Sequence, residues 1–155
     1  MKKIITIQAL LLLLAFITQA QDATVRTKQY NLESGLAIQG YDPVAYFTNY
    51  KAVKGSKEHA LYHQGVTYYF VSNASKEVFK KDPSHYEPQY GGWCAYAMGA
   101  KGEKVSIDPK TFKIVDGKLY LFYNKLFNNT RTEWDKDETG LRSKADANWK
   151  KISGS

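Results

Sequence analysis

The stretch "VTYYFVSNASKEVFKKDPSHY", Val66 to Tyr86, decides the fold class, because it changes from a strand pattern to a helix pattern within a few residues. Its first six residues, Val66–Val71, are all β-branched or aromatic, which is typical of a strand. Ser72 or Asn73 then offers an N-cap to a helix over Ala74–Lys81. The sequence therefore predicts a strand followed directly by a helix.

Two β-hairpins follow from turn residues that lie between strand-like runs. The runs His59–Tyr62 and Val66–Val71 flank His63-Gln64-Gly65. The runs Phe112–Val115 and Lys118–Tyr123 flank Asp116-Gly117, and Asp-Gly is a strong signal for a two-residue hairpin turn. Both faces of the second strand of this hairpin are apolar, so we expect it to be central or covered.

Helices are predicted on either side of these hairpins. Asp42-Pro43 and Asp82-Pro83 each begin a short helical turn, because Asp caps a helix and Pro is tolerated at its first position. Longer helices are expected over Gln89–Ala100, Asn124–Trp134 and Thr139–Ile152. Their expected buried positions are Leu126, Phe127, Trp134, Leu141, Ala145, Trp149 and Ile152. The predicted fold is α+β, a single small domain of antiparallel β-hairpins packed by short helices, with a helical C-terminus.

The N-terminus has the layout of a secretory signal peptide. Lys2 and Lys3 precede an apolar run, and the small residues Thr18 and Ala20 stand at the −3 and −1 positions of a cleavage site. We expect residues 1–20 to be this signal, 21–37 an N-terminal extension and 38–152 the domain. The protein is then exported, to the periplasm or the extracellular space, without stable insertion into the membrane once the signal is removed.

The charge balance argues against a nucleic-acid partner. The whole chain carries a formal net charge of +7, of which two lysines belong to the predicted signal. The remaining lysines are scattered, whereas nucleic-acid-binding proteins gather basic residues on one face. We therefore expect the partner to be a metal ion, a small molecule or another protein, and the sequence does not identify a protein partner.

Five ordered blocks resemble one known family. They read "GYDPVAYF" from Gly40, "YYFVSNASKEVFKKDPSHY" from Tyr68, "PQYGGWCAYA" from Pro88, "VDGKLYLFYN" from Val115 and "KADANWKKI" from Lys144. Together they make the chain similar to exported, stand-alone YHS domain-containing proteins of bacteria. The resemblance implies a non-enzymatic binding or accessory domain.

The resemblance also implies metal binding through cysteines, and here the chain departs from the family pattern. Ala45, Val71 and Ser75 occupy the corresponding places. Alanine and valine cannot coordinate a metal, and serine is a poor ligand for soft metals. The metal function of the family therefore does not carry over through these positions.

Cys94 is the single cysteine and the centre of the alternative hypotheses. With the Met98 thioether and one histidine, His59, His63 or His85, it would make a soft site suited to copper as Cu(I). It could instead be the nucleophile of a thiol-dependent enzyme or a redox-active thiol, with His85 and Asp82 or Glu87 as partners.

Two further hypotheses need no reactive thiol. Cys94 could be a small buried residue in a purely structural interaction module. A small ligand could also bind beside the Asp42 turn, in a pocket lined by Tyr41, Tyr46 and Tyr90.

Overall fold

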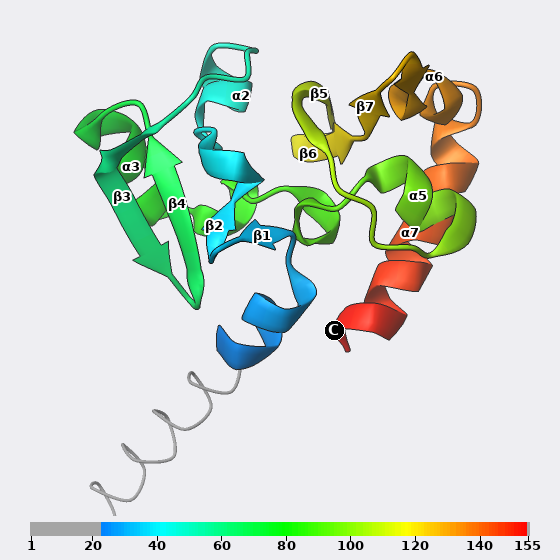
Figure 1. Ribbon diagram of the computed structural model, residues 1–155, viewed down its shortest axis with the longest axis horizontal. Coiled ribbons are helices and arrows are strands. Elements are labelled where there is room, and N and C mark those ends of the chain that lie inside the picture. Colours follow the sequence, from blue (N-terminus) through cyan, green and yellow to red (C-terminus); the bar gives the residue numbers. More distant parts are fainter. Residues whose placement is uncertain (1–22, 155) are drawn as a thin grey trace, which may run out of the picture.

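The computed structural model describes residues 23–154, so the predicted signal peptide lies outside the described residues. Helices and mainly antiparallel strands form one small domain with a helical C-terminus, which confirms the α+β fold class. Figure 1 shows two halves side by side, the first built around β3 and β4 and the second around α5 and α7. No helix within 23–154 is both long and apolar enough to cross a bilayer.

The first half contains a four-stranded sheet in the order β1-β2-β4-β3. Strands β3 and β4 are the predicted hairpin, with the turn at Gln64-Gly65, and β4 also pairs in parallel with β2. β1 and β2 fall in the segment 21–37 that the sequence analysis assigns to an N-terminal extension, yet they lengthen this sheet. The strands are β1 (Leu32–Glu33), β2 (Leu36–Ala37), β3 (Ser56–His63) and β4 (Val66–Phe70).

The helices of the first half begin where capping residues stand. The Ser72 side chain accepts a hydrogen bond from the Ser75 N–H at 3.1 Å, and Asp82 accepts one from the His85 N–H at 3.2 Å. Both caps confirm the sequence-based predictions. These helices are η1 (Ile38–Gly40), α2 (Ala45–Thr48), α3 (Asn73–Lys81) and α4 (Pro83–Tyr86), and a further helix covers 23–29.

In the second half, the predicted hairpin with the Asp116-Gly117 turn is confirmed, and so is the C-terminal helix. The predicted helix over 89–100 is divided in two, because Tyr90 and Gly91 adopt φ values of 57° and 60° that no right-handed helix contains. The elements are η2 (Gln89–Gly92), α5 (Ala95–Lys101), β5 (Asp108–Val115), β6 (Lys118–Phe122), β7 (Asn124–Lys125), β8 (Asn128–Asn129), α6 (Thr130–Trp134) and α7 (Glu138–Ser153).

The prediction of a helix over the whole of 124–134 is wrong. Its first half is the β7–β8 hairpin, and α6 begins only at Thr130, where the Asn129 side chain accepts the Arg131 N–H at 3.1 Å. Leu126 and Phe127, which we expected to be buried, form the hairpin turn and are 90% and 109% exposed. Local capping by an asparagine therefore overrides the apolar spacing in this segment.

Strand β6 separates two hydrophobic cores. Leu119 and Leu121 pack in the core of the first half, whereas Tyr120 and Phe122 pack in the core of the second half. All four side chains are buried, which confirms that both faces of this strand are covered. Because the hydrophobic effect operates on both faces, β6 joins the two halves into one domain.

Candidate functional site

The Asp42 carboxylate is a fully buried hydrogen-bond centre. Oδ1 accepts from the N–H groups of Val44 at 2.8 Å and Ala45 at 3.4 Å. Oδ2 accepts from the Val71 N–H at 2.9 Å and from the Ser75 hydroxyl at 2.6 Å. A buried carboxylate must be satisfied in this way because its desolvation is costly. Asp42 therefore ties the beginning of α2 to the junction between β4 and α3.

The three positions at which the resemblance calls for cysteines all meet at this carboxylate. Ala45, Val71 and Ser75 each donate a hydrogen bond to Asp42, two of them through the backbone. The only side chains of this cluster that could ligate a metal ion are thus the Asp42 carboxylate and the Ser75 hydroxyl. Both already take part in hydrogen bonds. This set does not fit a soft metal ion, which prefers thiolate or thioether ligands.

The tyrosines predicted to line a pocket with Asp42 lie apart from one another. The Tyr46 hydroxyl donates to the Pro109 carbonyl at 2.8 Å in the first core, and burial raises the pKa of Tyr46 far above its ordinary value. The Tyr90 hydroxyl donates to Asp146 Oδ1 at 2.9 Å beside the second core. Tyr41 carries the Lys54 ammonium 4.9 Å above its ring. These side chains therefore do not converge on one ligand.

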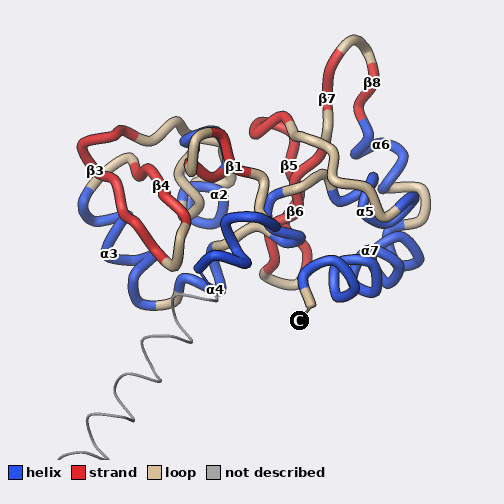
Figure 2. Tube along the Cα trace, turned by 60° about the horizontal axis from the view of Figure 1, so that its bottom comes forward, coloured by secondary structure: helices blue, strands red, loops and turns tan. Residues whose placement is uncertain are grey.

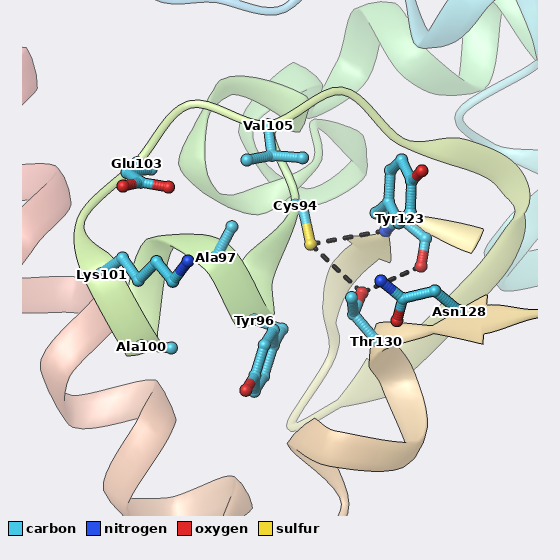
Figure 3. A pocket seen from close by; sticks show the side chains of 10 residues that line it. All are labelled: Cys94, Tyr96, Ala97, Ala100, Lys101, Glu103, Val105, Tyr123, Asn128 and Thr130. Carbon is cyan, nitrogen blue, oxygen red and sulfur yellow. Dashed lines mark hydrogen bonds between the residues drawn. The ribbon is translucent and has the colours of Figure 1, made fainter. Parts of the chain in front are cut away.

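Cys94 is fully buried and its thiol has two hydrogen-bond partners (Figure 3). The Tyr123 N–H donates to Sγ at 3.4 Å, and the Thr130 hydroxyl oxygen lies 3.4 Å from Sγ. The Thr130 hydroxyl donates its proton to the Tyr123 carbonyl at 2.9 Å. The thiol therefore lies in a closed set of hydrogen bonds with the Thr130 hydroxyl and the Tyr123 backbone.

The other residues of the predicted copper site lie elsewhere. Met98 is buried in the second core, whereas Cys94 belongs to the first. The His63 ring packs edge-on against Phe79, and burial lowers the pKa of His63. His85 lies 4.9 Å from the Phe47 ring and 4.7 Å from the Tyr86 ring. Across residues 23–154, no three His, Cys, Asp or Glu side chains are placed to hold a metal ion together.

The catalytic assembly considered for Cys94 is also not brought together. His85 and Asp82 line a separate polar cavity with Asp116 and Lys118. The Glu87 carboxylate instead accepts hydrogen bonds from the Arg26 guanidinium and from the Tyr68 hydroxyl, the latter at 2.7 Å. None of the predicted partners His85, Asp82 and Glu87 therefore lies beside the thiol as nucleophilic catalysis requires.

A cavity of about 290 Å³ opens beside Cys94. The small side chains of α5 and Val105 form its apolar wall, and Tyr96 and Tyr123 add aromatic rings. In Figure 3, Lys101 and Glu103 lie on one side, and Asn128 and Thr130 on the other. This volume lies at the lower limit of ligand pockets, which span about 300–1,000 Å³. The full lining is Cys94, Tyr96, Ala97, Ala100, Lys101, Glu103, Val105, Tyr123, Asn128 and Thr130.

No protein-family model, no curated protein and no solved structure matches this chain. The likeness to YHS proteins thus rests on the sequence blocks quoted above. Function has to be argued from the chemistry of the site, because a fold by itself does not fix a function.

Sequence reasoning named Cys94 but missed the cavity around it. One usable signal was the pair Ala97 and Ala100, whose small side chains leave space on one face of α5. A second was Gly102, which adopts the left-handed conformation at φ 68° and so ends α5 just before Glu103. The contribution of Asn128 and Thr130 depends on the β7–β8 hairpin, which the sequence analysis did not predict.

The buried thiol leads to a direct test. We expect Cys94 in the native chain to react with a small aromatic disulfide reagent at least ~100-fold more slowly than in denaturant, because labelling requires local opening. Labelling is followed by the absorbance of the released thiolate. Ala147→Cys, at an exposed position of α7, provides a fast-reacting control thiol. Native labelling at the denatured rate would contradict a packed thiol and favour the thiol-dependent alternative.

Proposed function

We propose that this chain is a non-enzymatic binding module of an exported YHS-type protein, and that it binds a small organic molecule in the cavity beside Cys94. One observation carries the proposal: the cavity joins an apolar wall to a rim that holds an amine, a carboxylate and an amide, from Lys101, Glu103 and Asn128. Ligand sites commonly combine a mainly apolar lining with a few polar groups that fix orientation.

The lining indicates the chemical class of the ligand. Ala97, Ala100 and Val105 would contact an apolar group, which gains free energy by leaving water. Lys101 and Glu103 have no ion pair within the part of the chain that the structure describes, so both charges are available to a ligand. The cavity therefore suits a small molecule with an apolar part and a charged or zwitterionic head.

The surroundings of Cys94 support binding rather than catalysis. Its sulfur accepts from the Tyr123 backbone N–H and shares a hydrogen bond with the Thr130 hydroxyl. A nucleophile needs an adjacent base to remove its proton, and the lining of this cavity contains no histidine. In this proposal Cys94 holds the cavity floor in place.

Ala100 offers a way to test the cavity. It is exposed and lines the cavity, so Ala100→Trp is expected to fill the space without disturbing a core. We expect fragments with an apolar group and a charged head to bind the wild-type chain, with an affinity at least about tenfold lower in Ala100→Trp. Ligand-observed NMR measures this binding.

A matched variant and a metal titration give the contradicting outcomes. Ala147→Trp adds the same side chain at an exposed helical position outside the cavity and should leave fragment binding unchanged. Equal fragment binding by wild type and Ala100→Trp would contradict the cavity proposal. Under anaerobic conditions, one-to-one Cu(I) binding that is lost in Cys94→Ala would replace it with a metal-handling function.

A further inference from the structure

The β7–β8 hairpin projects from the body of the domain (Figure 2). It has two cross-strand pairs, Asn124↔Asn129 and Lys125↔Asn128, and its turn consists of Leu126 and Phe127. These two are the most exposed large hydrophobic residues in the described chain, at 90% and 109%, ahead of Tyr50 at 74%. Two adjacent apolar side chains are therefore presented to solvent at the end of a protrusion.

The backbone of this turn is unfavourable for the residues that form it. Leu126 and Phe127 have φ values of 52° and 65°, and a two-residue hairpin turn with both φ values positive favours Asn-Gly or Asp-Gly. The other three hairpins within residues 23–154 have glycine at the second turn position, namely Gly35, Gly65 and Gly117. Strained residues that add nothing to a core commonly have a functional reason.

Lysines and the Glu103 and Asp108 carboxylates both lie around the hairpin, and Lys125 of β7 is the charge beside its tip. Lys101 shares the Cys94 cavity with Asn128 of β8. Lys110 lies beside Thr111, whose hydroxyl oxygen accepts the Asn124 amide at 3.0 Å at the base of the hairpin. None of the three lysines has an ion pair within residues 23–154. Their charges are thus free to meet an anionic surface.

The shape of the hairpin indicates which anionic surface. A stable protein interface takes about 800 Å² from each partner, whereas here two apolar side chains stand on a stem whose other exposed residues are Lys125 and Asn128. A narrow apolar tip with an adjoining lysine fits the boundary between lipid headgroups and acyl chains. Lysine side chains near that boundary are attracted to anionic lipids.

We propose that the β7–β8 hairpin docks this protein on a bilayer with anionic headgroups. Leu126 and Phe127 enter the interfacial layer, and Lys125, which adjoins the tip, contacts the headgroup phosphates. This inference stands independently of the ligand proposed for the Cys94 cavity, because none of its observations requires that cavity to be filled.

Vesicle binding tests the proposal. Flotation of the full chain with vesicles of equal parts phosphatidylcholine and phosphatidylglycerol is compared with pure phosphatidylcholine. We expect the double variant Leu126→Asn/Phe127→Gly to lower the partition coefficient on the anionic vesicles at least about tenfold. The same variant should have a Tm equal to or above that of wild type, because Asn-Gly relieves the turn. Tyr62→Ser, which removes an exposed aromatic ring on β3, serves as the matched control and should bind as wild type does.

A depth measurement makes the outcome specific to the tip. In Phe127→Trp, brominated lipids should quench more of the tryptophan fluorescence than they quench in wild type. Unquenched Trp fluorescence from the added residue would overturn the proposal, as would equal partition on anionic and neutral vesicles. A difference in oligomeric mass between wild type and the Leu126→Asn/Phe127→Gly variant, measured without vesicles, would also overturn it. The tip would then be a self-association surface.

Discussion

Asp42→Ala is expected to lower the free energy of unfolding by about 3–5 kcal/mol, because several hydrogen-bond donors lose their common acceptor. The substitution leaves the buried N–H group of Val44, and the part-buried N–H group of Val71 and hydroxyl of Ser75, without their acceptor. Each unsatisfied group costs about 1–3 kcal/mol. Because domains of this size are stable by only about 5–15 kcal/mol, the variant should be marginal. Urea unfolding followed by circular dichroism measures the loss.

Ser75→Ala is the matched control for this network. It removes a single donor and leaves the carboxylate with its three backbone partners, so we expect a loss of only about 0.5–1.5 kcal/mol. A similar stability of Asp42→Ala and Ser75→Ala would mean that the carboxylate is not the centre of the network. The urea midpoints of the two variants are compared directly, and the midpoint of Asp42→Ala should be the lower of the two.

The sequence was a sufficient guide where the structure depends on neighbouring residues. The Asp116-Gly117 turn, the Ser72 cap and the Pro83 helix start are each set within about four residues, and each was predicted. The contacts of the candidate sites instead join residues that lie far apart in the sequence. Asp42 meets Val71 and Ser75 across 29 and 33 positions, and Cys94 meets Thr130 across 36. No periodicity or capping rule carries information over such separations.

The largest error fell on Leu126 and Phe127, and its physical reason is instructive. Apolar spacing predicts which residues would share a face, but not whether a core covers that face. Here Asn129 caps α6 just after the apolar pair, which leaves the pair in a turn that its side chains disfavour. Conflict between local preference and observed structure is expected to concentrate at functional sites. The same conflict supports the docking role proposed for this hairpin.

Raising the pH above 10 is expected to unfold the protein, and buried tyrosines are the cause. Burial raises the pKa of Tyr30 from 10.0 to about 12, and it raises the pKa of Tyr46 and Tyr68 further. In the unfolded chain these hydroxyls ionise near pH 10. Above that pH the unfolded state has released protons that the folded state still holds, so the free energy of unfolding falls as pH rises.

The size of the effect follows from the number of tyrosines involved. Each one lowers the free energy of unfolding by about 1.4 kcal/mol per pH unit. Burial also raises the pKa of Tyr90, so these four tyrosines together lower it by about 5–6 kcal/mol per unit. Stability should therefore be constant below the unfolded pKa and lost between pH 10 and about 12, the pKa of Tyr30 in the folded chain.

Near-ultraviolet absorbance of tyrosinate and circular dichroism, recorded on one pH titration, check this prediction. The two signals should change together, because the buried hydroxyls ionise only as the chain unfolds. Tyr30→Phe should make the loss of stability shallower, whereas Tyr62→Phe, at an exposed position, should leave it unchanged. If every tyrosine instead ionised near pH 10 while the circular dichroism stayed native, the buried hydroxyls of Tyr46 and Tyr68 would have to be open to solvent. The first core, to which both side chains belong, would then be less tightly packed than the structure requires.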